Sequence, residues 1–321
     1  MARLRSQNGA GAIPAAAGAR ARASLVRARD RALSATFVAV ERLGFHLLPV
    51  TYFSPVPDTR RLGPELWSAR TELAGVTLDG GPMLELAARW ARTYGDEMRF
   101  PLEPTGRDGE YYVENTWYQS ADAETLYSMV RDLKPRRVVE IGSGYSTLLT
   151  TMAAARNAGE GRPCEVTCIE PYPAPWLRGV TGVTRLIDRP VQTVPLDTFE
   201  DLGEGDILFI DSSHVLRIGS DVQYEFLEIL PRLARGVVVH VHDIFLPAEY
   251  PRPWITESHR FLNEQYLLQA FLAFNTEFEV LWAASWMHLN HPAELEAAFP
   301  SYRRELSWPS SFWIRRRPAT R

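Results

Sequence analysis

Two pairs of polar residues that could carry out acid–base chemistry follow apolar runs in the C-terminal half of the chain. Asp211 and His214 follow ILFI, and His242 and Asp243 follow VVVHV. A histidine ionises near neutral pH, so it can take a proton from a reacting hydroxyl, and a nearby carboxylate can orient it. We therefore predict catalytic roles for Asp211 and His214, with His214 as the general base.

A divalent metal ion is a second use for the same kind of residues. Carboxylates with an imidazole are common ligands of divalent cations, and oxygen-rich sets favour magnesium or manganese. The candidate ligands are Asp211, His242 and Asp243. A bound Mg²⁺ or another divalent cation would lower the pKa of a substrate hydroxyl and orient it. An iron site with two histidines and one carboxylate is less attractive, because its H-x-D/E spacing is absent.

A glycine-containing loop supplies a different chemistry. The stretch VVEIGSGYSTLL places Gly142 and Gly144 between an apolar run and a helical pattern. Glycine lets the backbone approach a ligand closely, and a helix N-terminus offers unpaired N–H groups. The motif G-x-G-x-x-G is incomplete, because Thr147 stands at the third glycine. Glu170 ends the next apolar run and could accept the hydroxyls of a ribose. The combination predicts a nucleoside cofactor.

These motifs resemble those of the class I S-adenosyl-L-methionine (SAM)-dependent methyltransferases over roughly residues 110–321. The resemblance implies an α/β, Rossmann-like fold with a seven-stranded mixed sheet in the order 3-2-1-4-5-7-6, an antiparallel last strand and helices on both faces. It also implies SAM as the cofactor. The residues that would contact it are Glu140, Gly142, Ser143, Gly144, Ser146, Glu170 and Asp211, with Asp188 and Gln192 as candidates near the adenine.

Within this family the pattern is most similar to bacterial small-molecule and sugar O-methyltransferases. Their metal-dependent members pair an Asp-x-x-His element after the fourth strand with an acidic pair after the fifth. By this resemblance Asp211 would be a metal ligand, His214 the general base and Asp243 a second ligand. The chain departs from the pattern at His242, where the family has a carboxylate. That histidine either supplies a nitrogen ligand or indicates a site without metal.

The segment that follows Asp243 is rich in proline and aromatic residues and is expected to lie over the site. Segments in this position often shape the pocket for the acceptor substrate. The candidate substrate contacts are Tyr250, Trp254, Glu257 and Arg260. Aromatic side chains with a few polar groups would suit a small molecule or a glycan.

The elements that must position these residues are expected from about Thr116 onward, where apolar strands alternate with helical patterns. Strands are predicted at 136–142, 164–171, 183–188, 205–211, 236–243, 277–284 and 311–316, and helices at 121–133, 146–157, 222–235, 263–274 and 291–299. We expect three regions: a disordered Ala/Gly/Arg-rich tail over 1–22, an accessory helical and extended region over 23–115, and a methyltransferase domain over 116–321.

The accessory region begins with a predicted amphipathic helix from Ser24 to Gly44 that carries several arginines. Such a helix could rest on an anionic membrane surface, or it could pack against the main body or another subunit. We favour packing, because Asp30 and Glu41 dilute the positive face. A homo-oligomer formed through the N-terminal region is one form of that packing.

Composition excludes some classes of partner. The 321 residues are 45% hydrophobic and 23% charged, which is ordinary for a globular protein. Residues 1–31 carry a net charge of +6 within a total of −4, so the remainder is acidic, which argues against nucleic-acid binding. No apolar run is long enough to span a bilayer. The two cysteines, Cys164 and Cys168, are expected to be free thiols, which together predicts a cytoplasmic protein.

The residues and the resemblance together predict a SAM-dependent methyltransferase, of EC 2.1.1 type, that acts on an oxygen of a small molecule or glycan. An NAD-dependent oxidoreductase is an alternative, since strand, G-x-G loop, helix and a following acid also fit a nicotinamide cofactor. A second alternative is a non-catalytic protein that keeps the fold as a scaffold.

Overall fold

The computed structural model describes residues 14–318, and the chain divides into two units, Met1–Arg61 and Leu62–Arg321. In the first unit, helix α1 (Pro14–Glu41) is followed by an irregular segment that ends in a short 3-10 turn at Thr59–Arg61. Alanine and arginine, which dominate α1, are strong helix formers. Residues 1–13 of the tail expected over 1–22 lie outside the described residues, and residues 14–22 belong to α1.

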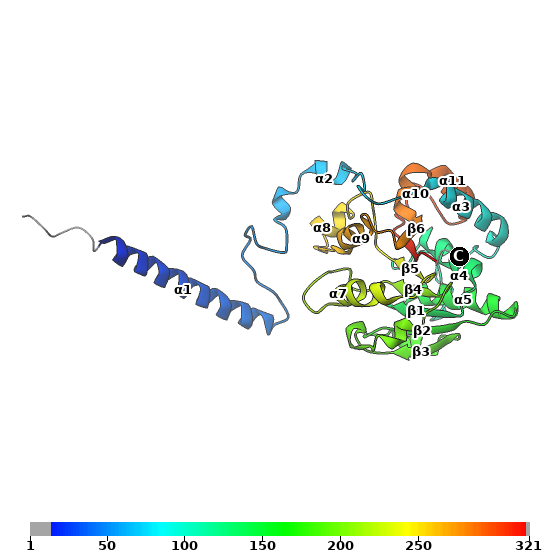
Figure 1. The fold of residues 1–321 in the computed structure, drawn as a ribbon, viewed down its shortest axis with the longest axis horizontal. Coiled ribbons are helices and arrows are strands. Elements are labelled where there is room, and N and C mark those ends of the chain that lie inside the picture. Colours follow the sequence, from blue (N-terminus) through cyan, green and yellow to red (C-terminus); the bar gives the residue numbers. More distant parts are fainter. Residues whose placement is uncertain (1–13, 319–321) are drawn as a thin grey trace, which may run out of the picture. The chain divides into compact units, whose positions relative to one another are not determined.

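The second unit is built on one seven-stranded sheet, seen edge-on in Figure 1. The strand order is β3-β2-β1-β4-β5-β7-β6, which confirms the predicted order, and β7 is antiparallel to both of its neighbours. The strands are β1 (Arg137–Ile141), β2 (Glu165–Ile169), β3 (Val183–Ile187), β4 (Ile207–Ile210), β5 (Val238–Val241), β6 (Phe278–Ala283) and β7 (Phe312–Arg316).

The register of the four central strands brings their carboxyl ends to one edge. Ile141 in β1 is opposite Ile169 in β2 and Ile210 in β4, and Ile210 is opposite Val241 in β5. The next residue of each strand therefore falls in one row, which consists of Gly142, Glu170, Asp211 and His242. Ligands of open α/β sheets bind outside this edge.

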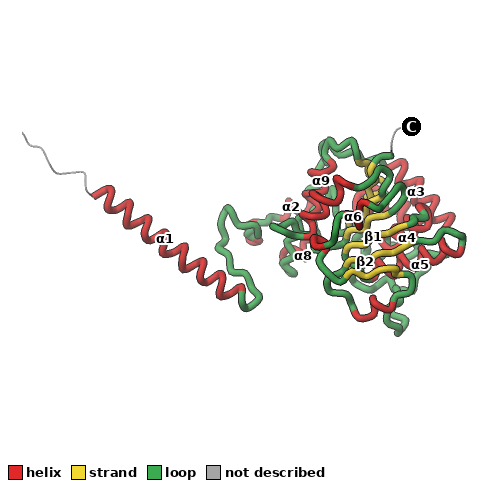
Figure 2. The backbone as a smooth tube through the Cα atoms, turned by 60° about the horizontal axis from the view of Figure 1, so that its bottom comes forward, coloured by secondary structure: helices red, strands yellow, loops and turns green. Residues whose placement is uncertain are grey.

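Helices cover both faces of the sheet. In Figure 2, α3 (Gly80–Tyr94), α4 (Asp122–Leu133) and α5 (Tyr145–Gly159) lie on one side of the strands, and α8 (Arg252–Thr256) and α9 (Glu264–Leu272) lie on the other. The remaining helices are α2 (Pro64–Ser68), α6 (Asp197–Glu200), α7 (Asp221–Tyr224), α10 (Ala284–Asn290) and α11 (Pro292–Ala298). None of the described helices is both long enough and apolar enough to cross a bilayer.

The single helix expected over 222–235 is broken into three short pieces. After α7, a π-helical turn spans Glu225–Ile229 and a 3-10 turn spans Leu230–Arg232. Pro231 has no N–H to donate and its ring crowds the preceding turn, so a regular helix cannot pass through it. The π-helical turn carries the buried Glu225 carboxylate, which accepts a hydrogen bond of 3.1 Å from Ser212 beneath the sheet edge.

Residues 62–115 pack into the core of the second unit instead of forming a separate accessory region with 23–61. Trp90 of α3 is fully buried, and its ring centre lies 5.2 Å from that of Trp282 in β6. The ring of Phe299, which follows α11, stacks on the Trp90 ring with ring centres 6.4 Å apart. The division of the chain accordingly falls at residue 61 and not at residue 115.

Candidate active site

A cleft of about 1480 Å³ opens at the carboxyl edge of the sheet. Its walls come from the loops after β1, β2, β4 and β5, from the segment before α4 and from the segment before β7. The lining includes Gly142, Ser143, Gly144, Ser146, Glu170, Asp211, His214, His242, Asp243, Trp254 and Arg260, which are predicted site residues that the fold brings to one cavity.

The loop after β1 requires glycine at position 142. Gly142 has φ of +79°, and a Cβ built there would lie 1.8 Å from the backbone oxygen of Asp211. No side chain fits that space, so the glycine lets the β1 loop pass directly over the end of β4. Gly144 differs, because a Cβ there would meet nothing within 4 Å. Its side faces the open cleft.

Glu170 is fixed against the same loop. Its two carboxylate oxygens accept the N–H groups of Ser143, at 3.2 Å, and of Tyr172, at 2.8 Å. These bonds hold the carboxylate at the cleft wall, where its remaining lone pairs are available to a ligand. The Ser143 hydroxyl is buried and has no hydrogen-bond partner among the described residues.

Glu140 lies beneath the loop and does not line the cleft. It is fully buried, and the Ser146 hydroxyl of α5 donates a 2.5 Å hydrogen bond to it. Burial raises the pKa of Glu140 to about 8, although the hydrogen bond from Ser146 lowers it. Glu140 therefore ties the start of α5 to β1, while Ser146 itself reaches the cavity.

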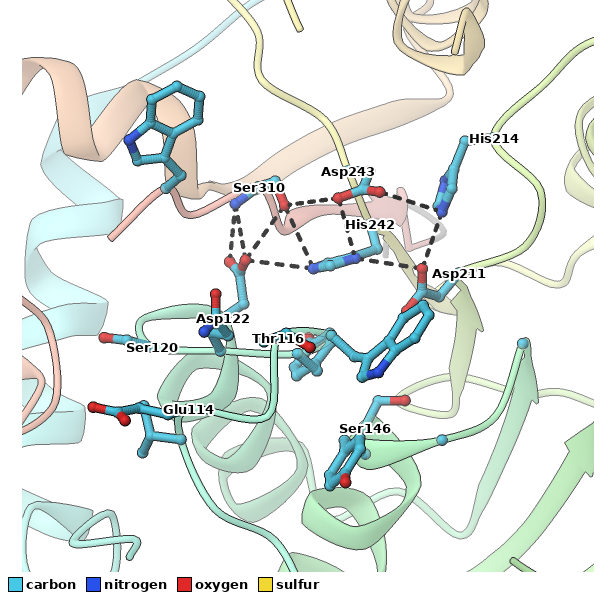
Figure 3. Close-up of a pocket in the computed structure, with 18 of the residues that line it drawn as sticks. Glu114, Thr116, Ser120, Asp122, Ser146, Asp211, His214, His242, Asp243 and Ser310 are labelled. Atoms are coloured by element: carbon cyan, nitrogen blue, oxygen red, sulfur yellow. Dashed lines mark hydrogen bonds and ion pairs between the residues drawn. The ribbon is translucent and has the colours of Figure 1, made fainter. Parts of the chain in front are cut away.

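Five ionisable side chains form a connected group that we call the charged cluster: Asp122, Asp211, His214, His242 and Asp243 (Figure 3). Nε2 of His214 lies 3.2 Å from Asp211 and 3.5 Å from Asp243. Nδ1 of His242 lies 3.3 Å from Asp211 and 3.6 Å from Asp243, and its Nε2 lies 3.4 Å from Asp122. Asp211 is the most exposed member, with 23% of its side chain accessible.

The charges in the cluster stabilise one another. Burial alone would lower the pKa values of His214 and His242, but the surrounding carboxylates raise both well above the usual 6.5. Burial would likewise raise the pKa of Asp211, but the two imidazoles lower it below its usual range. The carboxylates therefore favour the cationic form of both imidazoles. On its other face, Nδ1 of His214 lies 2.8 Å from Glu264 of α9.

The backbone at the two turns is itself unusual. His214 has φ of +58° and Asp243 has φ of +55°, values that side-chain-bearing residues rarely adopt. Such conformations cost about 1–3 kcal/mol each and persist where the surroundings enforce them. Here they turn the imidazole and the carboxylate toward the cleft immediately after β4 and β5.

Asp122 and Ser310 complete the cluster, although neither was predicted as a site residue. Asp122 begins α4 and accepts the backbone N–H groups of Ser310 and Ser311, each at 2.9 Å, from the segment before β7. The Ser310 hydroxyl lies 3.4 Å from His242. Other aromatic residues of the cleft lining were also not predicted as site residues, among them Trp117, Tyr172, Trp176 and Trp308.

His240 is a core residue of β5. It is fully buried and stacks on Phe209 with ring centres 4.0 Å apart. Burial lowers its pKa well below 6.5, and the neighbouring His242 lowers it further. It remains neutral and contributes no charge to the cleft.

Besides Glu140, four of the predicted contacts lie outside the cleft. Asp188 is exposed and pairs with Arg178, and the Gln192 side chain donates to the backbone oxygen of Gly219. Tyr250 is buried, because Phe245, Ile255 and Leu262 surround it in a small apolar cluster. Glu257 is exposed and does not line the cavity. The part of the cleft next to β2 is lined instead by residues that follow this strand, which include Tyr172 and Trp176.

The candidate metal ligands do not have the geometry of a metal site. Among residues 14–318 no group of three or more histidine, cysteine, aspartate or glutamate side chains is arranged to hold an ion. His242 lies between the carboxylates of Asp122 and Asp211, and both of its nitrogens face them. The imidazole thus fills the space in which those carboxylates would converge on a cation.

Comparison with known proteins gives one family match. The sequence profile of a family described as a methyltransferase domain matches residues 139–244, from β1 to just beyond β5. A protein of Archaeoglobus fulgidus, described only as uncharacterized, is 32% identical over 168 residues. The alignment covers 50% of this chain and 75% of that protein.

Two solved structures are similar at 14% identity. One is an O-methyltransferase from Bacillus cereus in complex with SAH. The match covers 74% of this chain and 91% of that protein, with a TM-score of 0.33. A putative protein-L-isoaspartate O-methyltransferase from Plasmodium falciparum, in complex with S-adenosyl-L-homocysteine, is matched over 39% of this chain with a TM-score of 0.25. The chain spans 60% of that protein's length.

Proposed function

We propose that the chain transfers the methyl group of SAM to a hydroxyl oxygen of a small molecule or glycan, since its residues 139–244 match the profile of a methyltransferase domain. One observation carries the proposal. A single cleft has a glycine loop and Glu170 along one wall and the charged cluster along the other. A nucleoside cofactor and an acceptor hydroxyl could thus meet at the edge of the sheet.

The residues after β1 and β2 suit SAM. The open side of Gly144, the unpartnered hydroxyl of Ser143 and the fixed carboxylate of Glu170 would hold the methionyl part and the ribose. Tyr172 and Trp176 offer aromatic surface for the adenine. SAM bound there would supply a methyl group on an electrophilic sulfonium.

The charged cluster would handle the proton of the acceptor. The acceptor oxygen forms the bond to the methyl carbon as the carbon–sulfur bond breaks, and that electron pair returns to sulfur, which leaves SAH. His214 takes up the hydroxyl proton and must be neutral to do so. Because its pKa is raised, we propose that the rate increases as the pH rises above neutral. The remaining contribution is positioning of the two reactants.

Aromatic side chains near the cluster support an acceptor with a ring. Trp254 lies at the cleft wall, and the Arg260 guanidinium stacks 4.3 Å above its ring. Trp117 and Trp308 are mostly exposed on the cavity lining. Flat aromatic surfaces beside polar groups bind sugar rings and aromatic acceptors alike, so we propose both classes as substrates to screen.

Calorimetric titration with SAM and SAH tests the cofactor. We expect saturable binding of both ligands, and Glu170→Ala should weaken it by about tenfold or more, because charged hydrogen bonds to the ribose are lost. Glu257→Ala, on an exposed residue outside the cleft, is the matched control and should bind as the wild type does. No binding of SAM or SAH would overturn the proposal, and binding of NADH instead would favour the oxidoreductase alternative.

A transfer assay tests the chemistry. The protein is incubated with SAM and a panel of hydroxylated small molecules and glycans, and SAH release is measured. His214→Asn should retain SAM binding and lose transfer. If no acceptor supports SAH release while SAM binds normally, the scaffold alternative is favoured over the enzyme.

A further inference from the structure

We propose that methyl transfer at this site does not use a divalent cation, and that the His242 ring occupies the place that a cation would take among the carboxylates of the cluster. The inference rests on the proposed function, since it concerns how that reaction is stabilised. It uses three features of the charged cluster: the neighbours of the two ring nitrogens, the balance of charge, and the immobility of the ring.

Both nitrogens of His242 face the surrounding carboxylates. Nε2 is 3.4 Å from Asp122, and Nδ1 is 3.3 Å from Asp211 and 3.6 Å from Asp243. The ring therefore occupies the space in which these carboxylates would converge on a cation.

The negative charge that would attract a dication is already matched. Asp122, Asp211 and Asp243 face two imidazoles, His214 and His242, within 3.6 Å. The Arg260 guanidinium adds a third positive charge 3.8 Å from Asp243. A fourth carboxylate, Glu264, lies outside the cleft lining, 2.8 Å from Nδ1 of His214. Each of the three carboxylates that line the cleft is thus already paired with a basic side chain.

The His242 ring is held in place. Its side chain is 7% exposed, and the Tyr118 ring lies 4.7 Å from it on one side while the His240 ring lies 5.7 Å away. The Ser310 hydroxyl adds a contact at 3.4 Å. The ring is therefore fixed between the carboxylates, and no space opens there for an ion.

Metal titrations of the full-length protein test the inference without knowledge of the acceptor. Wild-type protein is titrated with MnCl₂ and with MgCl₂ in a calorimeter, and no saturable binding is expected. His242→Asp should bind Mn²⁺ at least about tenfold more tightly than the wild type, because the new carboxylate joins three others while a cation is lost. His242→Asn is the matched control, since it removes the ring without adding charge, and it should not gain Mn²⁺ binding.

The titrations distinguish failure of the inference from failure of the proposed function. Stoichiometric Mn²⁺ binding by the wild type that Asp243→Asn abolishes would overturn the inference, as would equal Mn²⁺ affinities in His242→Asp and His242→Asn. If His242→Asp does not fold, the wild-type and Asp243→Asn titrations decide alone. SAM binding is measured separately in EDTA and should equal that in Mg²⁺. Failure of SAM to bind in either buffer would refute the proposed function and leave the metal result unaffected.

Discussion

Gly142 is the residue on which the glycine loop depends most directly. A methyl group at this position would overlap the Asp211 backbone oxygen, and φ of +79° is strained for any other residue. Gly142→Ala should therefore lower the free energy of unfolding by about 1–3 kcal/mol and weaken SAM binding, because the loop must move off β4. Denaturant unfolding and calorimetry measure the two effects. Gly159→Ala, where no atom lies within 4 Å of the new methyl, is the control and should leave both unchanged.

The protonation states of the three neighbouring histidines follow from their surroundings. Carboxylates raise the pKa values of His214 and His242, whereas burial lowers that of His240. Nitrogen-detected NMR at pH 7 should show the rings of His214 and His242 doubly protonated and the ring of His240 neutral. Asp211→Asn should lower the pKa values of His214 and His242. A neutral His242 in the wild-type protein at pH 7 would contradict this assignment.

The raised pKa values of His214 and His242 predict how the stability of the protein depends on pH. A histidine whose pKa is raised on folding stabilises the protein fully below its unfolded value near 6.5, and this contribution is lost as the pH rises through the folded value. The melting temperature of the wild type should therefore fall between neutral and alkaline pH. His242→Gln should show a shallower fall, because it no longer loses that contribution. If the melting temperatures of the wild type and of His242→Gln fall equally steeply with pH, the raised pKa of His242 adds nothing to stability.

At the scale of elements, helix α3 tests whether residues 62–115 are part of the main core. Trp90 is fully buried against Trp282 and Phe299, so Trp90→Ala should cost about 3–5 kcal/mol of unfolding free energy. Trp117→Ala is the matched control: its side chain is 77% exposed on the cleft lining, and its loss should change stability by less than about 0.5 kcal/mol. Denaturant unfolding of the two variants should separate them clearly.

The strands of the sheet could be predicted because each is a short apolar run with turn residues at its ends. Parallel pairing then brings the residues after β1, β2, β4 and β5 to one edge, which accounts for Gly142, Glu170, Asp211 and His242. The helix over 222–235 was predicted as continuous, and it is broken because Pro231 outweighs its apolar periodicity.

Other parts of the site could not be read from the sequence. Asp122 meets Ser310 across 188 residues, and nothing local in either segment indicates that pairing. Asp188 and Gln192 were placed near the adenine by the position of β3 alone, whereas the path of the loop after β2 decides which side chains line the cleft.

At the scale of the whole molecule, the first unit presents apolar side chains that its own fold leaves exposed. Leu43, Phe45, Leu47, Tyr52 and Phe53 each expose more than half of their surface. Contiguous exposed apolar residues commonly mark interaction surfaces. We propose that this region associates with another copy of the chain, as the packing interpretation of its helix suggested.

Removal of residues 1–61 tests that proposal. Because Leu62–Arg321 forms a unit of its own, the shortened protein should fold and bind SAM with unchanged affinity. Its mass in solution should be that of a monomer, whereas the full chain should be a dimer or larger by light scattering. Phe45→Ser with Phe53→Ser, two exposed substitutions, should reproduce the loss of association without truncation. A monomeric full-length chain that binds vesicles of anionic lipid would instead favour the membrane surface as the partner of this region.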